Sequence, residues 1–169
     1  MKKDSTKRLC RAGVIASLYV VLTFAFSSFA FGPFQVRPAE ALCLLPLLFP
    51  EAVPALFIGC ALSNFLSAYS VYDIVFGSLA SLLAGLGTLY MGKLLKKQVL
   101  KITLGGLFPV LINAFVIPLI IVFLCGDTHA YESVQIAYFA NVAIFLGTQS
   151  VWVYGLGVPL YLSIKKLIK

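Results

Sequence analysis

The stretch PFQVRPAEALCLLPLLFP, residues 33–50, decides how this chain folds. Its second half is apolar but too short to cross a bilayer, unless the span begins near Pro33 and takes Arg37 and Glu40 into the membrane. Around it lie five stretches without Asp, Glu, Lys or Arg that are each long enough to span: residues 12–36, 52–72, 74–92, 102–126 and 133–164. The chain therefore crosses the membrane either five or six times.

The composition is that of a membrane protein. Of the 169 residues, 61% are hydrophobic and 11% are charged, and the mean hydropathy is +1.01. These values lie far outside the range of water-soluble domains, so a soluble globular protein is excluded. No separate soluble domain or internal repeat is visible, and residues 1–169 are expected to form a single membrane domain.

The positive charges favour six spans. If residues 33–50 span, both termini and the 93–101 loop are cytoplasmic, together with all but one of the 13 Lys and Arg residues. If they do not span, more than half of these residues face outward, against the positive-inside tendency. The net charge of +7 is then explained by cytoplasmic anchors facing anionic lipid, and no nucleic-acid partner is implied.

The predicted fold is an all-α integral membrane bundle of six transmembrane helices. The helices are expected at about residues 10–31, 38–49, 52–68, 72–92, 103–125 and 133–164. The first is expected to be retained rather than cleaved as a signal peptide. The second and third are short and rich in proline, so tilt, local thinning of the bilayer or irregular backbone is expected there.

Polar side chains in the outer half of the membrane are the candidates for ligand binding, because ionisable groups in a span are costly. Pro38 favours an extended Arg37 and suits the first turn of a helix, which places Glu40 near the helix N-terminus. The candidate binding residues are Phe34, Gln35, Arg37, Glu40, Tyr72, Asp73, Asn113, Glu132, Asn141, Gln149 and Trp152.

Most of these candidates also have a structural explanation. A salt bridge and helix cap that only start the second helix would account for Arg37 and Glu40. Tyr72 suits the interfacial aromatic belt, Asp73 a helix cap and Glu132 a solvated outer loop. The three amides can hydrogen-bond between helices. The four cysteines lie singly and predict small buried side chains rather than a metal site, and no cofactor is expected.

Residues 35–42, QVRPAEAL, and 46–50, PLLFP, are similar to the queuosine-precursor transporter family. The short six-helix chain, its polar first outer loop and the AGVIA sequence at 12–16 resemble the substrate-binding S component of an energy-coupling factor (ECF) vitamin transporter. This resemblance, which covers essentially the whole chain, implies a multi-pass protein of the bacterial cytoplasmic membrane. It would capture a 7-deazaguanine such as prequeuosine base or queuine from outside.

The resemblance also implies partners, namely a transmembrane T subunit and two ATPase subunits that drive release inward. Ala12 and Ala16 match the pattern by which S components pack on the T subunit. A separate energy source fits the sequence, because residues 87–93 only imitate a phosphate-binding loop and Leu94 stands where Ser or Thr would ligate magnesium.

The chemistry of a 7-deazaguanine suits the candidate residues. Glu40 or Glu132 could accept the two N–H groups of its guanine-like edge, and Asp73 or Glu132 could pair with an aminomethyl cation. Its carbonyl needs a hydrogen-bond donor, which could be Arg37, Asn141 or Gln149. Its ring could stack on Phe34, Tyr72 or Trp152. The alternatives are an S component for riboflavin, thiamine, biotin or another vitamin, and a non-transporting assembly subunit. No nucleophile or metal set indicates an enzyme.

Overall fold

The computed structural model of the protein describes residues 2–30, 36–67, 70–128 and 131–168. Its elements are all helical, and no strand occurs within these ranges. The α-helices are α1 (Lys2–Ala25), α2 (Ser27–Ala30), α3 (Ala52–Ser63), α4 (Ser70–Tyr72), α5 (Ser78–Leu94), α6 (Gln98–Leu119), α7 (Val134–Ser150) and α8 (Gly157–Ile168). The 3-10 helices are η1 (Pro38–Leu47) and η2 (Asn64–Leu66), and the π-helical segments are η3 (Asp73–Gly77), η4 (Ile120–Leu124) and η5 (Val151–Leu156). The predicted all-α fold is confirmed.

Four helical stretches within the described ranges are long and apolar enough to cross a bilayer: Asp4–Ala25, Asp73–Leu94, Gln98–Leu124 and Val134–Ile168. η1 and α3 are apolar but have only 10 and 12 residues. They are the same two helices that the sequence predicts to be short. The length and apolar character of these helices indicate a multi-pass membrane protein.

Two helices begin among basic residues, earlier in the chain than predicted. α1 begins at Lys2 rather than near residue 10, and α6 begins at Gln98 rather than near residue 103. Lys and Arg are good helix formers, so they extend both helices beyond the apolar stretch. At the other end of the chain, α8 continues through Lys165 and Lys166 to Ile168, beyond the predicted end at residue 164.

Other predicted helices differ in type. The predicted helix 38–49 is the 3-10 helix η1, with Pro38 at its start and Pro46 inside it. Proline has no backbone N–H, so Pro46 cannot donate an α-helical hydrogen bond, and this short segment adopts the tighter 3-10 geometry. The predicted helix 133–164 is interrupted by the π-helical segment η5 between α7 and α8.

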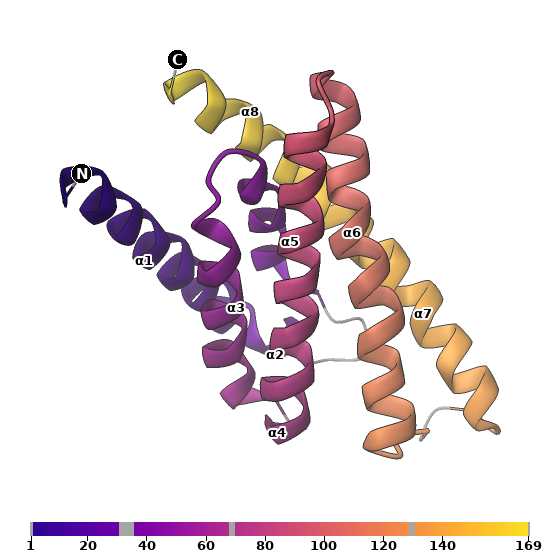
Figure 1. The fold of residues 1–169 in the computed structure, drawn as a ribbon. Helices are drawn as coiled ribbons and strands as arrows, with labels where there is room; N and C mark the ends of the chain where they lie inside the picture. Colours follow the sequence, from indigo (N-terminus) through magenta and orange to yellow (C-terminus); the bar gives the residue numbers. More distant parts are fainter. Residues whose placement is uncertain (1, 31–35, 68–69, 129–130, 169) are drawn as a thin grey trace.

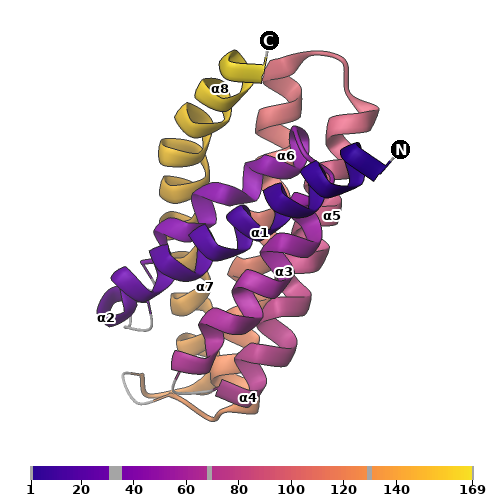
Figure 2. The ribbon, with the colours of Figure 1, turned by 90° about the vertical axis from the view of Figure 1, so that its left-hand side faces the viewer.

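The molecule has two distinct ends. Both termini and the turn that joins α5 to α6 lie at one end, whereas α4 and the connection from α6 to α7 lie at the other (Figures 1 and 2). We call these the basic end and the α4 end. The charge of the basic end comes from Lys and Arg residues in the first turns of α1, around the α5–α6 turn and in the last turns of α8. Those described are Lys7, Arg8, Arg11, Lys93, Lys96, Lys97, Lys101, Lys165 and Lys166.

The turn between η1 and α3 also lies beside the N-terminal part of α1. Arg11 Nε is 3.3 Å from Glu51 Oε1, and the Arg11 guanidinium carbon lies 4.6 Å from the centre of the Phe49 ring. η1 itself is enclosed by other helices, and all its residues from Pro38 to Pro46 are buried. Its irregular backbone is therefore covered by protein, as a membrane requires.

Candidate functional site

The carboxylate of Glu40 lies at the centre of a buried hydrogen-bond network, and the side chain is only 2% exposed. Its Oε1 accepts a hydrogen bond from the Tyr19 hydroxyl at 2.8 Å. Its Oε2 accepts from Asn113 Nδ2 and from the Cys43 thiol, each at 3.1 Å. Asn113 Nδ2 also donates to Gln149 Oε1 at 3.4 Å. One carboxylate thus connects η1 to α1 and α6, and through Asn113 to α7.

Arg37 is the residue that precedes η1, and its side chain lies near this network. Its backbone is extended, with φ −116° and ψ 90°, and Pro38 follows at the start of the helix, as predicted. The side chain is 6% exposed, and its Nε donates to the Ala30 carbonyl oxygen at 3.1 Å. A guanidinium and a carboxylate are therefore both buried in the same part of the bundle.

A small cavity lies between these groups. Its walls combine polar and apolar side chains, and they are formed by Arg37, Glu40, Cys60, Gly77, Ser81, Asn113, Ile117, Phe145 and Gln149. Its volume of about 10 Å³ is enough for one water molecule. A larger ligand would have to displace the walls.

Regular helix geometry is interrupted near the cavity. Gly77 ends the π-helical segment η3, and Gln149 stands two residues before η5. π-helical turns are uncommon and often mark functional sites, because they shift side chains out of regular helical register. The position of the cavity between two such segments supports a functional role.

Four of the predicted binding residues meet at this cavity, namely Arg37, Glu40, Asn113 and Gln149. The Glu40 carboxylate accepts hydrogen bonds from Tyr19 and Asn113 of other segments, in addition to Cys43, so its role is not confined to the start of its own helix. The bond between Asn113 and Gln149 also fits the structural alternative for these amides, since it links α6 to α7. One network thus holds helices together and forms the cavity wall.

Asp73 is also buried, at 3% exposure, but it belongs to a second polar cluster nearer the α4 end. Its carboxylate Oδ2 accepts a hydrogen bond from the Ser67 hydroxyl. Its backbone carbonyl oxygen accepts one from Asn64 Nδ2 at 2.6 Å. Asp73 begins η3, where Tyr72 occupies the capping position, so the predicted role of Asp73 as a helix cap is not what the structure shows.

Four other predicted residues lie away from the cavity. Tyr72 is 43% exposed and Glu132 is exposed. Asn141 Nδ2 donates to the Ala137 carbonyl oxygen in its own helix, at 2.8 Å. Trp152 lines a separate apolar groove of about 460 Å³ with Val36 and α7. Phe34 and Gln35 lie outside the described residues.

Several residues of the cavity wall or of the Glu40 hydrogen-bond network are not among those predicted from the sequence. Tyr19, Cys43 and Cys60 would have been classed as apolar helix residues, and nothing in their spacing distinguishes them. Phe145 is different, because it stands one helical turn from both Asn141 and Gln149 and supplies an aromatic ring that is 1% exposed. That spacing is the signal that could have identified it.

The predicted partner-binding residues Ala12 and Ala16 lie on α1. Both are half-buried and pack against the apolar cluster formed largely by α1, η1 and α3. α1 approaches α3 closely at this point, since a Cβ added at Gly59 would lie 3.1 Å from the Ala16 carbonyl oxygen. Only part of each alanine is left for contact with another protein.

Comparison with known proteins identifies relatives of this chain. The family model described as "QueT transporter" matches residues 9–166. The "Queuosine precursor transporter QueT" of Lactococcus lactis subsp. cremoris (strain MG1363) is 36% identical over 84 residues, which are 48% of this chain and 49% of that protein. The match thus spans about half the length of that relative. No solved structure matches. Because the family model covers nearly the whole chain, the chain belongs to the QueT transporter family.

Proposed function

We propose that this protein is the substrate-binding membrane subunit of an ECF-type importer and that it captures a queuosine precursor, a 7-deazaguanine, at the cavity beside Glu40. Membership of a transporter family makes it a transport protein rather than an enzyme. The name of the Lactococcus relative supports the choice of substrate. The observation that carries the proposal is the buried Glu40 carboxylate, which lies in a chain whose helices suit a membrane.

The Glu40 carboxylate suits the guanine-like edge of a 7-deazaguanine, which presents two neighbouring N–H groups. A carboxylate has about four lone-pair sites, and Tyr19, Cys43 and Asn113 occupy three of them. A ligand that donates twice must therefore displace at least one protein donor. The Cys43 thiol is the weakest of the three donors, and it is the one we expect to give way.

The other walls supply the remaining contacts of a purine-like ring. Arg37 and Gln149 carry N–H donors for the ligand carbonyl, and Phe145 offers an aromatic face. Because the cavity holds only about one water molecule, binding requires the walls to separate. The π-helical segments η3 and η5 border the walls and are where we expect this movement.

The proposed orientation has six spans with the basic end in the cytoplasm of a bacterial cell. The termini and the α5–α6 turn share that end (Figure 1), and its Lys and Arg residues follow the positive-inside tendency. The contact of Arg11 with Glu51 brings the η1–α3 turn beside α1 as well. This supports a path in which η1 leads to the cytoplasmic side and α3 returns from it.

The proposed partners are a T subunit and two ATPase subunits, with Ala12 and Ala16 on the T-subunit interface. Replacing both with Leu should abolish uptake in cells but leave substrate affinity of the purified protein within about twofold, because neither lines the cavity. Gly13→Leu is the control for bulk on the same helix, since a Cβ at Gly13 meets no atom within 4 Å. Normal assembly and uptake by the double variant would exclude this interface.

The direct test of the substrate is native mass spectrometry and isothermal titration of the purified protein. A 7-deazaguanine should copurify or bind with high affinity, and riboflavin, thiamine and biotin should not compete. Tight binding of one of these vitamins, with no binding of any 7-deazaguanine, would overturn the proposed substrate and leave the family assignment unchanged.

A further inference from the structure

The second buried cluster lies between the end of α3 and the start of η3. It contains Asp73, Asn64 and Ser67, which are 3%, 1% and 8% exposed. Ser67 donates to one oxygen of the Asp73 carboxylate, and Asn64 Nδ2 donates to the Asp73 carbonyl oxygen at 2.6 Å and to Cys60 Sγ at 3.5 Å. These bonds use the Asn64 amide nitrogen, so its oxygen is left as an acceptor.

Two oxygen atoms of this cluster are buried without a hydrogen-bond partner. They are Asp73 Oδ1 and Asn64 Oδ1. Both are acceptors. Buried acceptors in proteins almost always accept a hydrogen bond, because burying one without a hydrogen bond is costly. The cluster therefore offers acceptors and lacks a donor.

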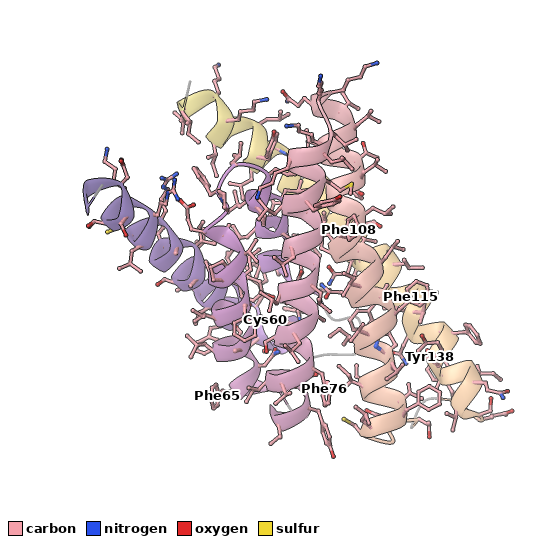
Figure 3. All side chains as sticks on the ribbon, viewed as in Figure 1. Cys60, Phe65, Phe76, Phe108, Phe115 and Tyr138 are labelled. Carbon is pink, nitrogen blue, oxygen red and sulfur yellow. The ribbon has the colours of Figure 1, made fainter. Side chains whose placement is uncertain are left out.

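The cluster adjoins the Glu40 cavity through η3. Gly77 and Ser81 line the cavity, and Asp73 begins the same π-helical segment that Gly77 ends. A Cβ added at Gly77 would lie 3.0 Å from Asn64 Nδ2, so Asn64 of the cluster packs directly against a residue of the cavity wall. Cys60, a wall residue bonded to Asn64, lies inside the bundle, while Phe65 and Phe76 lie toward the α4 end (Figure 3).

The kind of donor that fits is a small cation with N–H groups. Among the described residues no group of three or more His, Cys, Asp and Glu side chains could hold a metal ion, and this cluster has one carboxylate. An alkylammonium carries three N–H donors and no acceptor, which matches a cluster with one carboxylate oxygen and one amide oxygen left to accept.

We propose that Asp73 and Asn64, with Ser67 orienting the Asp73 carboxylate, form a second subsite that takes the protonated amine of an aminomethyl substituent on the substrate. The inference rests on the proposed function, with the guanine-like edge at Glu40. In 7-aminomethyl-7-deazaguanine the amine is on the five-membered ring, at the opposite end of the molecule from that edge. The protein is then selective for the cationic precursor over uncharged ones.

The test is isothermal titration of the purified protein with 7-aminomethyl-7-deazaguanine and with its uncharged 7-methyl analogue. The wild-type protein should bind the amine more tightly by roughly 10- to 150-fold, the range expected for a hydrogen bond to a charged group. Asp73→Asn should lose most of that preference and keep its affinity for the methyl compound, which also shows that it folds. Asp127→Asn removes a carboxylate outside the cluster and should keep the preference.

Each other outcome has a defined meaning. Equal wild-type affinities for the two compounds overturn the subsite and leave the proposed function standing, whereas no binding of either compound removes both. If Asp73→Asn does not fold, Asn64→Leu replaces the other acceptor with a side chain of similar size and should lose part of the preference. A wild-type preference retained in whichever variant folds overturns the proposal. Replacement of sodium by choline, a quaternary ammonium without N–H groups, should change nothing, and a loss of binding there would assign the cluster to an alkali ion instead.

Discussion

Replacing Glu40 with Gln tests the recognition of the substrate most directly. The wild-type carboxylate offers two acceptor oxygens to the guanine-like edge of the ligand, whereas the amide offers one acceptor and one donor. We expect the variant to bind 7-aminomethyl-7-deazaguanine roughly 10- to 150-fold more weakly. This corresponds to loss of one charge-assisted hydrogen bond, about 1.5 to 3 kcal/mol, at about 1.4 kcal/mol for each factor of ten.

The structure also indicates how the variant protein adjusts. Among the described residues, Oε2 accepts from both Cys43 and Asn113, while Oε1 accepts from Tyr19. The least costly arrangement therefore points the new amide nitrogen at Tyr19, whose hydroxyl can accept a hydrogen bond instead of donating one. The variant should lose only about 1 kcal/mol of stability, the net worth of an ordinary hydrogen bond. Binding is affected more than folding.

The assay is isothermal titration with the substrate and with an analogue that lacks the exocyclic amine. The wild-type protein should discriminate between the two, and Glu40→Gln should discriminate little. Thr88→Val is the matched control for a buried polar change, because Thr88 donates to the Gly105 carbonyl oxygen at 2.8 Å and does not line the cavity. Unchanged affinity in folded Glu40→Gln would refute the role of Glu40 and transfer recognition to Asp73 or Glu132.

Three further predictions use features outside the cavity. A membrane-impermeant maleimide should label Cys125 on intact cells and exposed Cys10 only after permeabilisation, since these residues lie toward opposite ends, and the reverse pattern would exclude the proposed orientation. Burial, with Asp73 and Asp127 nearby, raises the pKa of the Cys125 thiol just beyond the span, so its labelling should be slow near neutral pH and accelerate as the pH rises. Gly87→Ala should lower thermal stability by about 1 to 3 kcal/mol, because the new Cβ would overlap the Phe108 ring between α5 and α6. Gly13→Ala is the control and should be neutral or stabilising. Equal melting temperatures of the two variants would refute this packing.

The sequence predicts those parts of the site where a polar residue inside an apolar stretch carries a free-energy cost that can be recognised from the sequence alone. A charged residue in an apolar stretch needs a partner, and this requirement singles out Arg37 and Glu40 in the sequence alone. Asn113 and Gln149 are candidates for the same reason, and the structure brings both to the Glu40 cavity. The prediction therefore locates the polar centre of the bundle, although not its full composition.

The remaining parts depend on how each helix is rotated about its axis. Trp152 stands three residues after Gln149, and regular α-helical spacing would put both on one stripe. η5 begins at Val151, and its wider turn separates them, so that Gln149 faces the cavity and Trp152 the apolar groove. Tyr19 likewise reaches Glu40 only because α1 packs closely on α3 at Gly59. Neither feature can be read from hydrophobic periodicity.

In a membrane the apolar faces of helices gain little from meeting each other, because lipid is as apolar as the helix surface. Specific association then depends on close packing and on polar side chains that join helices, and the Glu40 network provides such links to α1, α6 and α7. The same donors must rearrange to admit a ligand, so binding exchanges contacts within the protein for contacts with the ligand. A substrate that satisfies Glu40 better than Cys43 does should stabilise the bundle against thermal unfolding, by about 2.7 kcal/mol at a concentration 100 times its dissociation constant.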